Sequence, residues 1–244
     1  MAEILLLSNS TAPGRSFLEH ALGVIAEVLH GRDRLLFIAL ASGEPDRYTQ
    51  MMRDGLAPIG IRVDHADAAG GLRDAIAEAD AVFVAGGNSF RLLKRLRALG
   101  VLDELRARVL AGVPYLGASA GANLACPTIR TTNDMPIVEP GSLRALGLIP
   151  FQINAHYPDA EAAHSPGTET RPRRIVEFLA ENDVPVLGMP EGTWLRLSGT
   201  RATTGGVTGC LLFRRGADRQ QLPAGSDVSA LLGRPVRFDA SEPL

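Results

Sequence analysis

The chain of 244 residues is 45% hydrophobic and carries 25 lysines and arginines against 27 acidic residues, for a net charge of −2. These proportions allow a full hydrophobic core, and they offer neither the basic stripe of a nucleic-acid-binding protein nor the polybasic patch of a membrane-surface protein. No leader pattern is visible, and no segment approaches the roughly twenty apolar residues of a membrane span. We expect a cytoplasmic protein with a small neutral or acidic substrate.

Short apolar runs alternate with helical patterns through the first half of the chain, as is typical of βαβ units and a parallel sheet. The expected strands are 4–7, 35–41, 61–63, 81–85 and 113–116, and the expected helices lie near 17–29, 48–56, 72–79 and 90–96. Asn88 or Ser89 is suited to cap the last of these helices. We predict an α/β fold with a mostly parallel sheet flanked by helices.

The second half of the chain is punctuated by prolines and is less regular. We therefore expect its loops to build the functional site. The pattern predicts a helix over 172–181 and a strand over 186–189. The alternation at 193–197 and the apolar run at 210–213 indicate a small antiparallel β extension near the carboxyl terminus.

A chain of this length and pattern is expected to form one α/β domain over residues 1–225. The hydrophobic pattern weakens after that point, and we expect 226–244 to be a loosely attached tail. Cys126 and Cys210 are too few for a disulfide framework or a thiolate metal site. They predict buried, reduced thiols.

A serine with small neighbours follows the strand expected at 113–116. In Gly117-Ala118-Ser119-Ala120-Gly121 the small residues let the backbone turn sharply from strand to helix, so that the Ser119 hydroxyl projects above the sheet edge. Such pentapeptides also occur as plain turns. The interpretation of Ser119 as a nucleophile therefore depends on a base, an acid and an oxyanion site elsewhere in the chain.

A serine nucleophile needs a base whose pKa lies near seven, and histidine is the usual choice. His156 follows the strand-like segment 151–154 and precedes Tyr157-Pro158, where a sheet would end in an active-site loop. The other four histidines fall on or near polar helix faces, at a strand end or in a polar loop. We expect His156 to be the base.

The imidazole of such a base needs a carboxylate that fixes its tautomer, and two candidates are available. Asp134 gives the chain order Ser, Asp, His, which α/β-hydrolases use. Glu191, in Met189-Pro190-Glu191-Gly192 after an expected strand, gives the order Ser, His, Glu. Both alternatives stay open at this point.

An acyl-transfer site also needs two N–H donors for the oxyanion. The segment Gly86-Gly87-Asn88, at the end of the fourth expected strand, suits this purpose because glycine lets a substrate approach the backbone. We expect the Gly87 and Ala120 N–H groups to be the donors. The same glycines could cradle a phosphate, but the segment lacks the lysine of a P-loop and the third glycine of a dinucleotide fingerprint.

Several motifs together resemble the peptidase E family of α-aspartyl dipeptidases. They are Ser8-Asn9-Ser10-Thr11, Gly86-Gly87-Asn88, Ser119-Ala120-Gly121-Ala122-Asn123, the run from Cys126 to Val138, and Pro190-Glu191-Gly192. The resemblance extends to about Phe213, and the run from Cys126 is too long and irregular to arise from fold constraints alone.

This resemblance implies a serine hydrolase that is related in fold to class I glutamine amidotransferases and cleaves dipeptides with an amino-terminal aspartate, without a metal or other cofactor. By the same similarity Ser119 is the nucleophile and His156 the base, and Asp134 and Glu191 both fall in family motifs. Ala85 and Ala118 depart from the family pattern, where a glycine and a bulky aromatic are expected. A small Ala118 beside the nucleophile would enlarge the site.

Selectivity for aspartate calls for an arginine, whose planar fork matches a carboxylate. Arg171, at the start of the helix after the His156 loop, is the first candidate and Arg130 the second. The substrate ammonium would be bound by whichever of Asp134 and Glu191 does not orient His156. We expect a small acidic dipeptide as partner and a monomer or homodimer.

Three other functions are compatible with these residues. A relative acting on β-aspartyl linkages, as cyanophycinases do, would use the same machinery. An esterase of the α/β-hydrolase type is disfavoured because no His-Gly-Gly-Gly oxyanion segment is present. A catalytically silent binding protein is disfavoured by the intact serine, histidine and acids.

Overall fold

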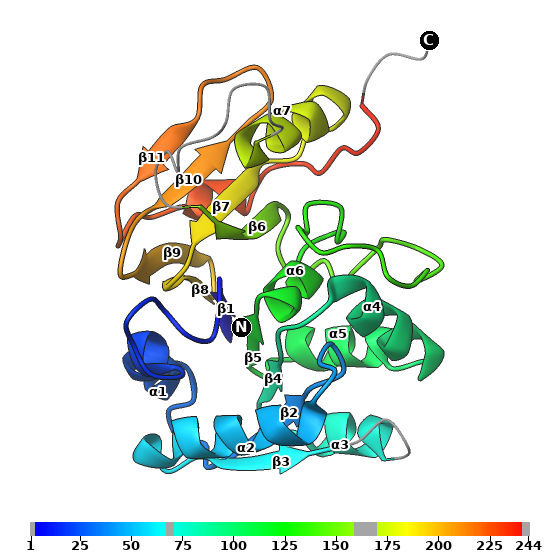
Figure 1. Ribbon diagram of the computed structural model, residues 1–244, viewed down its shortest axis with the longest axis vertical. Helices are drawn as coiled ribbons and strands as arrows, with labels where there is room; N and C mark the ends of the chain where they lie inside the picture. The colour runs from blue at the N-terminus through cyan, green and yellow to red at the C-terminus, as the bar shows by residue number, and fades with distance from the viewer. Residues whose placement is uncertain (1–2, 67–70, 159–169, 241–244) are drawn as a thin grey trace.

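The computed structural model describes residues 3–66, 71–158 and 170–240, which form two β-sheets with helices around them (Figure 1). The strands of the main sheet are β1 (Glu3–Leu7), β2 (Arg34–Ile38), β3 (Arg62–His65), β4 (Val82–Val84), β5 (Tyr115–Ala118), β8 (Thr193–Ser198) and β9 (Arg201–Gly206). The strands of the second sheet are β6 (Gln152–Tyr157), β7 (Val186–Pro190), β10 (Cys210–Phe213) and β11 (Gln220–Leu222).

The main sheet has the order β3-β2-β4-β5-β1-β8-β9, and its first five strands are parallel. The predicted mostly parallel α/β fold is therefore confirmed. The second sheet has the order β11-β10-β7-β6, in which only β6 and β7 are parallel. The antiparallel extension thus falls into two parts, since β8 and β9 extend the main sheet whereas β10 and β11 extend the second one.

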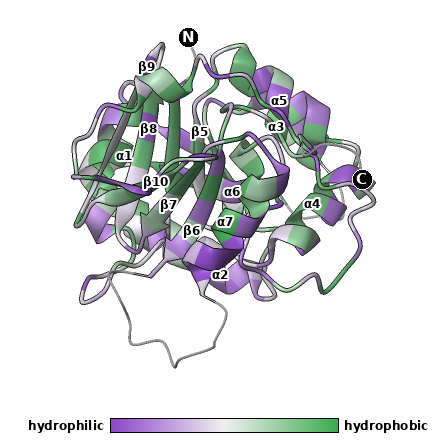
Figure 2. Cartoon of the chain, turned by 90° about the horizontal axis from the view of Figure 1, so that it is seen from above, coloured by the Kyte–Doolittle hydropathy of each residue, from purple (hydrophilic) through white to green (hydrophobic). Residues whose placement is uncertain are grey.

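Helices cover both faces of the main sheet because its strands are apolar on both sides. They are α1 (Leu22–Val28), α2 (Pro45–Leu56), α3 (Leu72–Glu78), α4 (Ser89–Ala98), α5 (Leu102–Leu110), α6 (Ala120–Ala125) and, on the second sheet, α7 (Arg171–Glu181). In β1, Leu5 and Leu7 pack in one cluster with α1 and α2, while Ile4 and Leu6 pack in another with α3 to α6. The central strands are accordingly mostly hydrophobic in Figure 2.

Helix α6 lies between the two sheets, where it contacts β4, β5 and β1 on one side and β6 on the other. All six of its residues are buried, and a helix that is buried all round must be apolar or small on every face. Its residue Gly121 is needed for close approach, because a Cβ there would lie 2.1 Å from the Val84 carbonyl oxygen. The five residues other than Asn123 meet these conditions, and the buried Asn123 side chain donates to Thr132 Oγ1 at 3.3 Å.

Some expected elements differ from the observed ones. The α5 helix was not predicted, although Leu102, Leu105 and Val109 are its buried residues and follow helical spacing. The first helix begins at Leu22 and not near residue 17, because Leu18 has a left-handed backbone with φ of 60°. The second strand ends at Ile38 and not at residue 41.

The prediction of a loosely attached tail is wrong for the described residues 226–240. Val228 and Leu231 are 4% exposed and belong to the main hydrophobic cluster. Asp239 forms an ion pair with Arg130 at 2.8 Å. The weak apolar pattern misleads here because few apolar side chains are involved: Leu232 also packs against the cluster, and the Phe238 ring contacts Phe178. Residues 241–244 lie outside the described part.

Both cysteines are free and buried. Burial raises the pKa of Cys126 to about 12 and that of Cys210 to about 11. Within residues 3–66, 71–158 and 170–240, no helix combines the length and the apolar character needed to cross a bilayer.

Candidate active site

Ser119 occupies the sharp turn between β5 and α6. Its backbone has φ of 52° and ψ of −108°, a sparsely populated conformation that strand-to-helix turns at nucleophiles adopt. The turn is anchored at both ends, because Ser119 N donates to Leu7 O and Asn123 N donates to Ser119 O. The side chain is thereby presented at the carboxyl edge of the main sheet.

His156 lies within β6, and not in a loop after the strand as expected. The β6–β7 pairing shifts register between Ala155 and Tyr157, and His156 at this bulge has a positive φ of 53°. A positive φ is unfavourable for a residue with a side chain. The bulge turns the imidazole out of the sheet and toward the end of β5.

The side chains of Ser119, His156 and Glu191 form a continuous series of contacts. His156 Nε2 is 2.9 Å from Ser119 Oγ, and His156 Nδ1 is 3.2 Å from Glu191 Oε1. The His156 and Glu191 side chains are 38% and 47% exposed, so solvent reaches both. Between the two acids left open by the sequence, Glu191 is the one that contacts the imidazole.

Asp134 lies at the start of α4 and not beside His156. Its Oδ2 atom accepts hydrogen bonds from Ser89 N at 2.7 Å and from Thr132 Oγ1 at 3.0 Å. Asn88 caps the same helix, since its side chain accepts from Arg91 N. Within the described ranges, no hydrogen bond engages Asp134 Oδ1, so this oxygen is available to a ligand.

The irregular segment that carries Asp134 is held against β6 by polar side chains. Thr131 Oγ1 donates to Ile153 O, Asn133 Nδ2 donates to Ala155 O, and Asn154 Nδ2 donates to Thr131 O. Since β6 is an edge strand, these bonds satisfy backbone groups that would otherwise be unpaired. The position of Asp134 relative to His156 thus depends on the polar residues of this segment.

Two backbone N–H groups point to a candidate oxyanion site. Neither Gly87 N nor Ala120 N has a hydrogen-bond partner in the part of the chain that the structure describes. Gly87 has φ of 134°, and a Cβ there would lie 2.4 Å from Ala41 O, so no other residue fits this turn. Asn88 N already donates to Ala41 O, so this N–H is not available to an oxyanion.

A cavity of about 480 Å³ opens beside Gly87 and Ser119. The residues that line it are Asn9, Ser10, Ala41, Ser42, Gly43, Tyr48, Gly86, Gly87, Asn88, Arg91, Ser119, Asp134 and His156. They come from the carboxyl ends of parallel strands and the segments that follow, which is where ligands bind in α/β sheets. The cavity brings Ser119, His156 and Asp134 to one space.

The structure adds functional candidates that the pattern of single residues did not reveal. The buried Ser8 hydroxyl accepts from His156 N at 2.9 Å and donates to Met189 O at 2.8 Å. Asn9 Oδ1 accepts from Gly192 N at 2.7 Å. Ser8 therefore fixes the backbone at the His156 bulge and at Met189, before Glu191. Asn9 fixes the backbone at Gly192, on the other side of Glu191.

A second pair lies in the cavity wall, where Tyr48 and Ser10 hydroxyls are 2.8 Å apart. Burial raises the pKa of Tyr48, which keeps the phenol neutral. Ser8, Asn9 and Ser10 belong to the motif Ser8-Asn9-Ser10-Thr11, which the sequence indicated without giving its members a role. Tyr48 lies outside any such motif.

The two arginine candidates have different surroundings. Arg130 binds Asp239 and Asn182 and stacks on the Phe238 ring, so its proposed role in substrate recognition is wrong. Arg171 is half-buried, and its Nη1 atom has no hydrogen-bond partner among the described residues. Burial and Arg174 lower the pKa of Arg171, whereas Glu191 raises it, which places Arg171 within electrostatic reach of Glu191.

Ala118 does not enlarge the cavity as expected. It is fully buried and packs in the cluster on the α1 and α2 side of the main sheet.

In the described ranges, no three His, Cys, Asp or Glu side chains gather as potential metal ligands.

Comparison with known proteins gives consistent matches. Residues 4–205 match the family model of Peptidase family S51. A protein named Peptidase E from Streptomyces coelicolor is 51% identical over 236 residues, which are 97% of this chain and 97% of that relative. Peptidase E from Citrobacter koseri is 47% identical over 226 residues, which are 91% of this chain and 98% of that relative.

A solved structure shows the same fold. The crystal structure of a peptidase from an acI-B1 Actinobacterium has a TM-score of 0.68 and 16% sequence identity to this chain. The match covers 93% of this chain and 96% of that one. Identity this low supports the fold and no finer statement.

Proposed function

The chain belongs to peptidase family S51, and from that membership we propose that it is a serine peptidase that hydrolyses dipeptides with an amino-terminal aspartate. The observation that carries the proposal is the series of contacts Ser119 Oγ to His156 Nε2 and His156 Nδ1 to Glu191 Oε1, at 2.9 and 3.2 Å. A nucleophile, a base and an orienting acid need this arrangement. The preference for aspartate rests on the resemblance of the sequence motifs.

In the first half of the reaction, His156 carries its proton on Nδ1, which donates to Glu191. Nε2 then accepts the Ser119 proton as Oγ attacks the carbonyl carbon of the peptide bond. The negative charge that develops on the carbonyl oxygen is stabilised by the Gly87 and Ala120 N–H groups. His156 next donates the proton to the leaving amine, and an ester between Ser119 and the aspartyl residue forms.

In the second half, a water molecule replaces the departed amine. His156 Nε2 accepts a proton from this water as its oxygen attacks the ester carbon, and the same N–H groups stabilise the oxyanion. The proton then returns to Ser119 Oγ, aspartate leaves, and the enzyme is restored. The exposure of His156 and Glu191 gives water access to this step.

We assign recognition of the substrate side-chain carboxylate to Arg171. Its buried Nη1 lacks a partner among the described residues, and a buried donor without a partner gains most from an incoming acceptor. Arg91 is the competing candidate, because it lines the cavity at Ser119. Replacing each by glutamine separates them, since only the receptor arginine determines the preference for Asp-Leu over Asn-Leu.

Asp134 is the acid that does not contact His156, and we assign it the substrate ammonium. It lines the same cavity as Ser119. One of its carboxylate oxygens is used by the α4 terminus, which fixes the side chain in place. The other can accept from a charged amine, and such charge-assisted hydrogen bonds are strong.

The test is a comparison of the wild-type protein with Ser119→Ala on the isomeric dipeptides α-Asp-Leu and β-Asp-Leu. We expect the wild type to cleave the α isomer, and the variant to show no turnover while unfolding at the wild-type temperature. Cleavage of the β isomer alone would assign the protein to β-aspartyl peptidases. Undiminished turnover by Ser119→Ala would refute the mechanism. Absence of both turnover and labelling of Ser119 by a fluorophosphonate would indicate a silent binding protein.

A further inference from the structure

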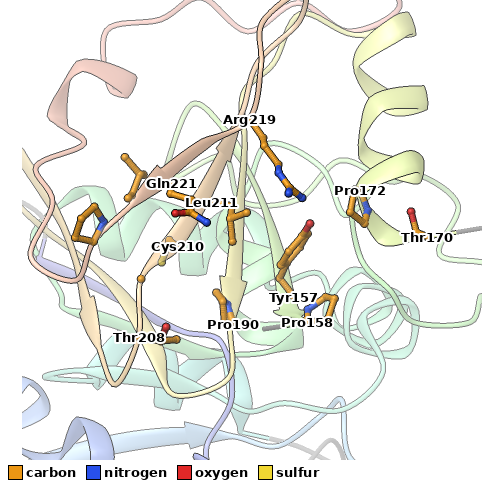
Figure 3. Close-up of a pocket in the computed structure, with 13 residues that line it drawn as sticks. Tyr157, Pro158, Thr170, Pro172, Pro190, Thr208, Cys210, Leu211, Arg219 and Gln221 are labelled. Atoms are coloured by element: carbon orange, nitrogen blue, oxygen red, sulfur yellow. The ribbon is translucent and has the colours of Figure 1, made fainter. Parts of the chain in front are cut away.

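A second and larger cavity, of about 650 Å³, lies against the second sheet and the start of α7 (Figure 3). Its lining residues come from the end of β6, the first turn of α7, the end of β7, and β10 and β11 with the segments beside them. This volume is within the range of small-molecule sites. None of these residues lines the cavity at Ser119.

The walls of this cavity are mostly apolar and conformationally stiff. Four prolines contribute to it, together with two leucines, and they are Pro158, Pro172, Pro190, Pro223, Leu211 and Leu222. Proline has a locked φ and little conformational entropy to lose on binding. Such a surface suits an aliphatic group.

Polar groups are confined to a small part of the lining. The Arg219 guanidinium and the Tyr157 hydroxyl are directed toward one another in Figure 3, and the charge of Arg219 opposes the effect of burial on the Tyr157 pKa. Gln221 lies nearby on β11. Arg219 has no ion pair with an acidic residue in the described ranges, so its charge is available to an anion.

A second positive charge lies close to the same hydroxyl. Arg171, between the lining residues Thr170 and Pro172, also acts on Tyr157 through its charge. Burial raises the pKa of Tyr157, and the phenol therefore stays a neutral donor. Arg171 does not itself line the cavity, so Arg219 and the Tyr157 hydroxyl are the groups that can bind an anion there.

We propose that this cavity is a second binding site, for a small carboxylate that carries an aliphatic side chain, with the carboxylate at Arg219 and Tyr157 and the side chain between the prolines. A single exposed guanidinium with neutral donors beside it matches one carboxylate, whereas a phosphate usually gathers more cations or backbone N–H groups. The apolar walls bind the remainder of the ligand.

The site is separate from the active site but shares backbone with it. Tyr157 and Pro190 line the cavity, and they are the chain neighbours of His156 and Glu191. The proposal does not depend on hydrolysis, because binding can be measured on Ser119→Ala. A protein without peptidase activity would still be expected to bind the ligand.

The test uses N-acetyl-L-leucine as the probe and isothermal titration calorimetry on Ser119→Ala. We expect saturable binding of one molecule per chain. Adding Arg219→Gln should raise Kd about tenfold or more, since it removes a charge-assisted hydrogen bond to the carboxylate. Tyr157→Phe should raise Kd by a smaller factor. N-acetyl-leucinamide, which lacks the carboxylate, should bind weakly, and Arg219→Gln should not change its affinity.

The matched control is Arg201→Gln, which removes an exposed arginine of β9 outside this cavity. It should bind N-acetyl-leucine as the parent does. No saturation in the millimolar range, equal affinity in Arg219→Gln and Arg201→Gln, or equal affinity for the acid and its amide would each overturn the proposal.

Discussion

At the scale of single residues, the two acids near the cavity have different contacts and should have different roles. Glu191 contacts His156, while Asp134 is bound to the α4 terminus with one oxygen free. An orienting acid acts mainly in the transition state, whereas an acid that binds the substrate ammonium acts already in the ground state.

The first prediction compares Glu191→Gln with Asp134→Asn. Glu191→Gln should lower kcat about 10- to 100-fold with little change in KM, a smaller loss than for a fully buried acid because Glu191 is 47% exposed. Asp134→Asn should chiefly raise KM, about tenfold. Steady-state kinetics on α-Asp-Leu measures both. A lower kcat at unchanged KM in Asp134→Asn would reverse the assignment.

The second prediction concerns the Ser8 hydroxyl, which is the partner of His156 N at the bulge. Ser8→Ala leaves the His156 N–H without its partner, in a residue that itself has a positive φ. The expected cost in unfolding free energy is about 1–3 kcal/mol. We expect kcat to fall about tenfold or more as His156 shifts, with KM nearly unchanged.

The control for Ser8→Ala is Thr204→Val, which removes another fully buried hydroxyl, in β9. The two variants should lose stability in urea by similar amounts, but only Ser8→Ala should lose kcat. Equal loss of kcat in both would show that Ser8 has a structural role alone.

At the scale of elements, helix α6 is the piece that brings the site together. It is enclosed by both sheets and places Ser119 at its start. Its small residues are consequently a packing requirement of two sheets at once, and not a property of the turn alone.

The third prediction is that Gly121→Ala strongly destabilises the protein. The added Cβ would lie 2.1 Å from Val84 O, and the backbone of α6 would have to move. We expect a loss of about 3 kcal/mol or more of unfolding free energy, together with loss of activity because Ser119 moves with the helix.

The matched control for Gly121→Ala is Gly23→Ala in α1, where a Cβ would meet nothing within 4 Å. This change should stabilise the protein by about 0.5–1 kcal/mol. Urea unfolding of both variants measures the difference. Equal unfolding free energies of the two variants would contradict the prediction, because they would show that α6 can accommodate a Cβ at position 121.

At the scale of the whole molecule, the buried thiols predict how stability depends on pH. The pKa of Cys126 is raised from 9.0 to about 12 and that of Cys210 from 9.0 to about 11. Above pH 9.0 the unfolded chain ionises its thiols while the folded chain retains their protons. Their contribution is therefore fully present below this pH and declines above it.

The fourth prediction follows from that sign. Between pH 8 and pH 10 the wild type should lose about 3 kcal/mol more unfolding free energy than Cys126→Ala/Cys210→Ala. Tyr115 is present in both proteins, and burial is the larger cause of its raised pKa, ahead of Cys126, so its contribution largely cancels. Urea unfolding at the two pH values checks the result. Parallel declines would contradict it.

Local sequence patterns were enough to predict the alternation of strands and helices and the proximity of Ser119 to the sheet edge. Apolar periodicity reports which face of an element is buried, and small residues report where a turn must be tight. The motifs around Gly87 and His156 indicated the kind of chemistry. These signals are local, and they can be read along the chain.

The contacts between distant groups, by contrast, depend on how the elements pack in three dimensions. Periodicity does not name the partner of a buried face, so the division of β6 to β11 between two sheets and the docking of the tail through Val228 were not visible. Likewise, the contact of Glu191 with His156, and the commitment of Arg130 to Asp239, depend on distances between segments far apart in sequence. Hydrogen bonds act over about 3 Å, and that separation is fixed by packing alone.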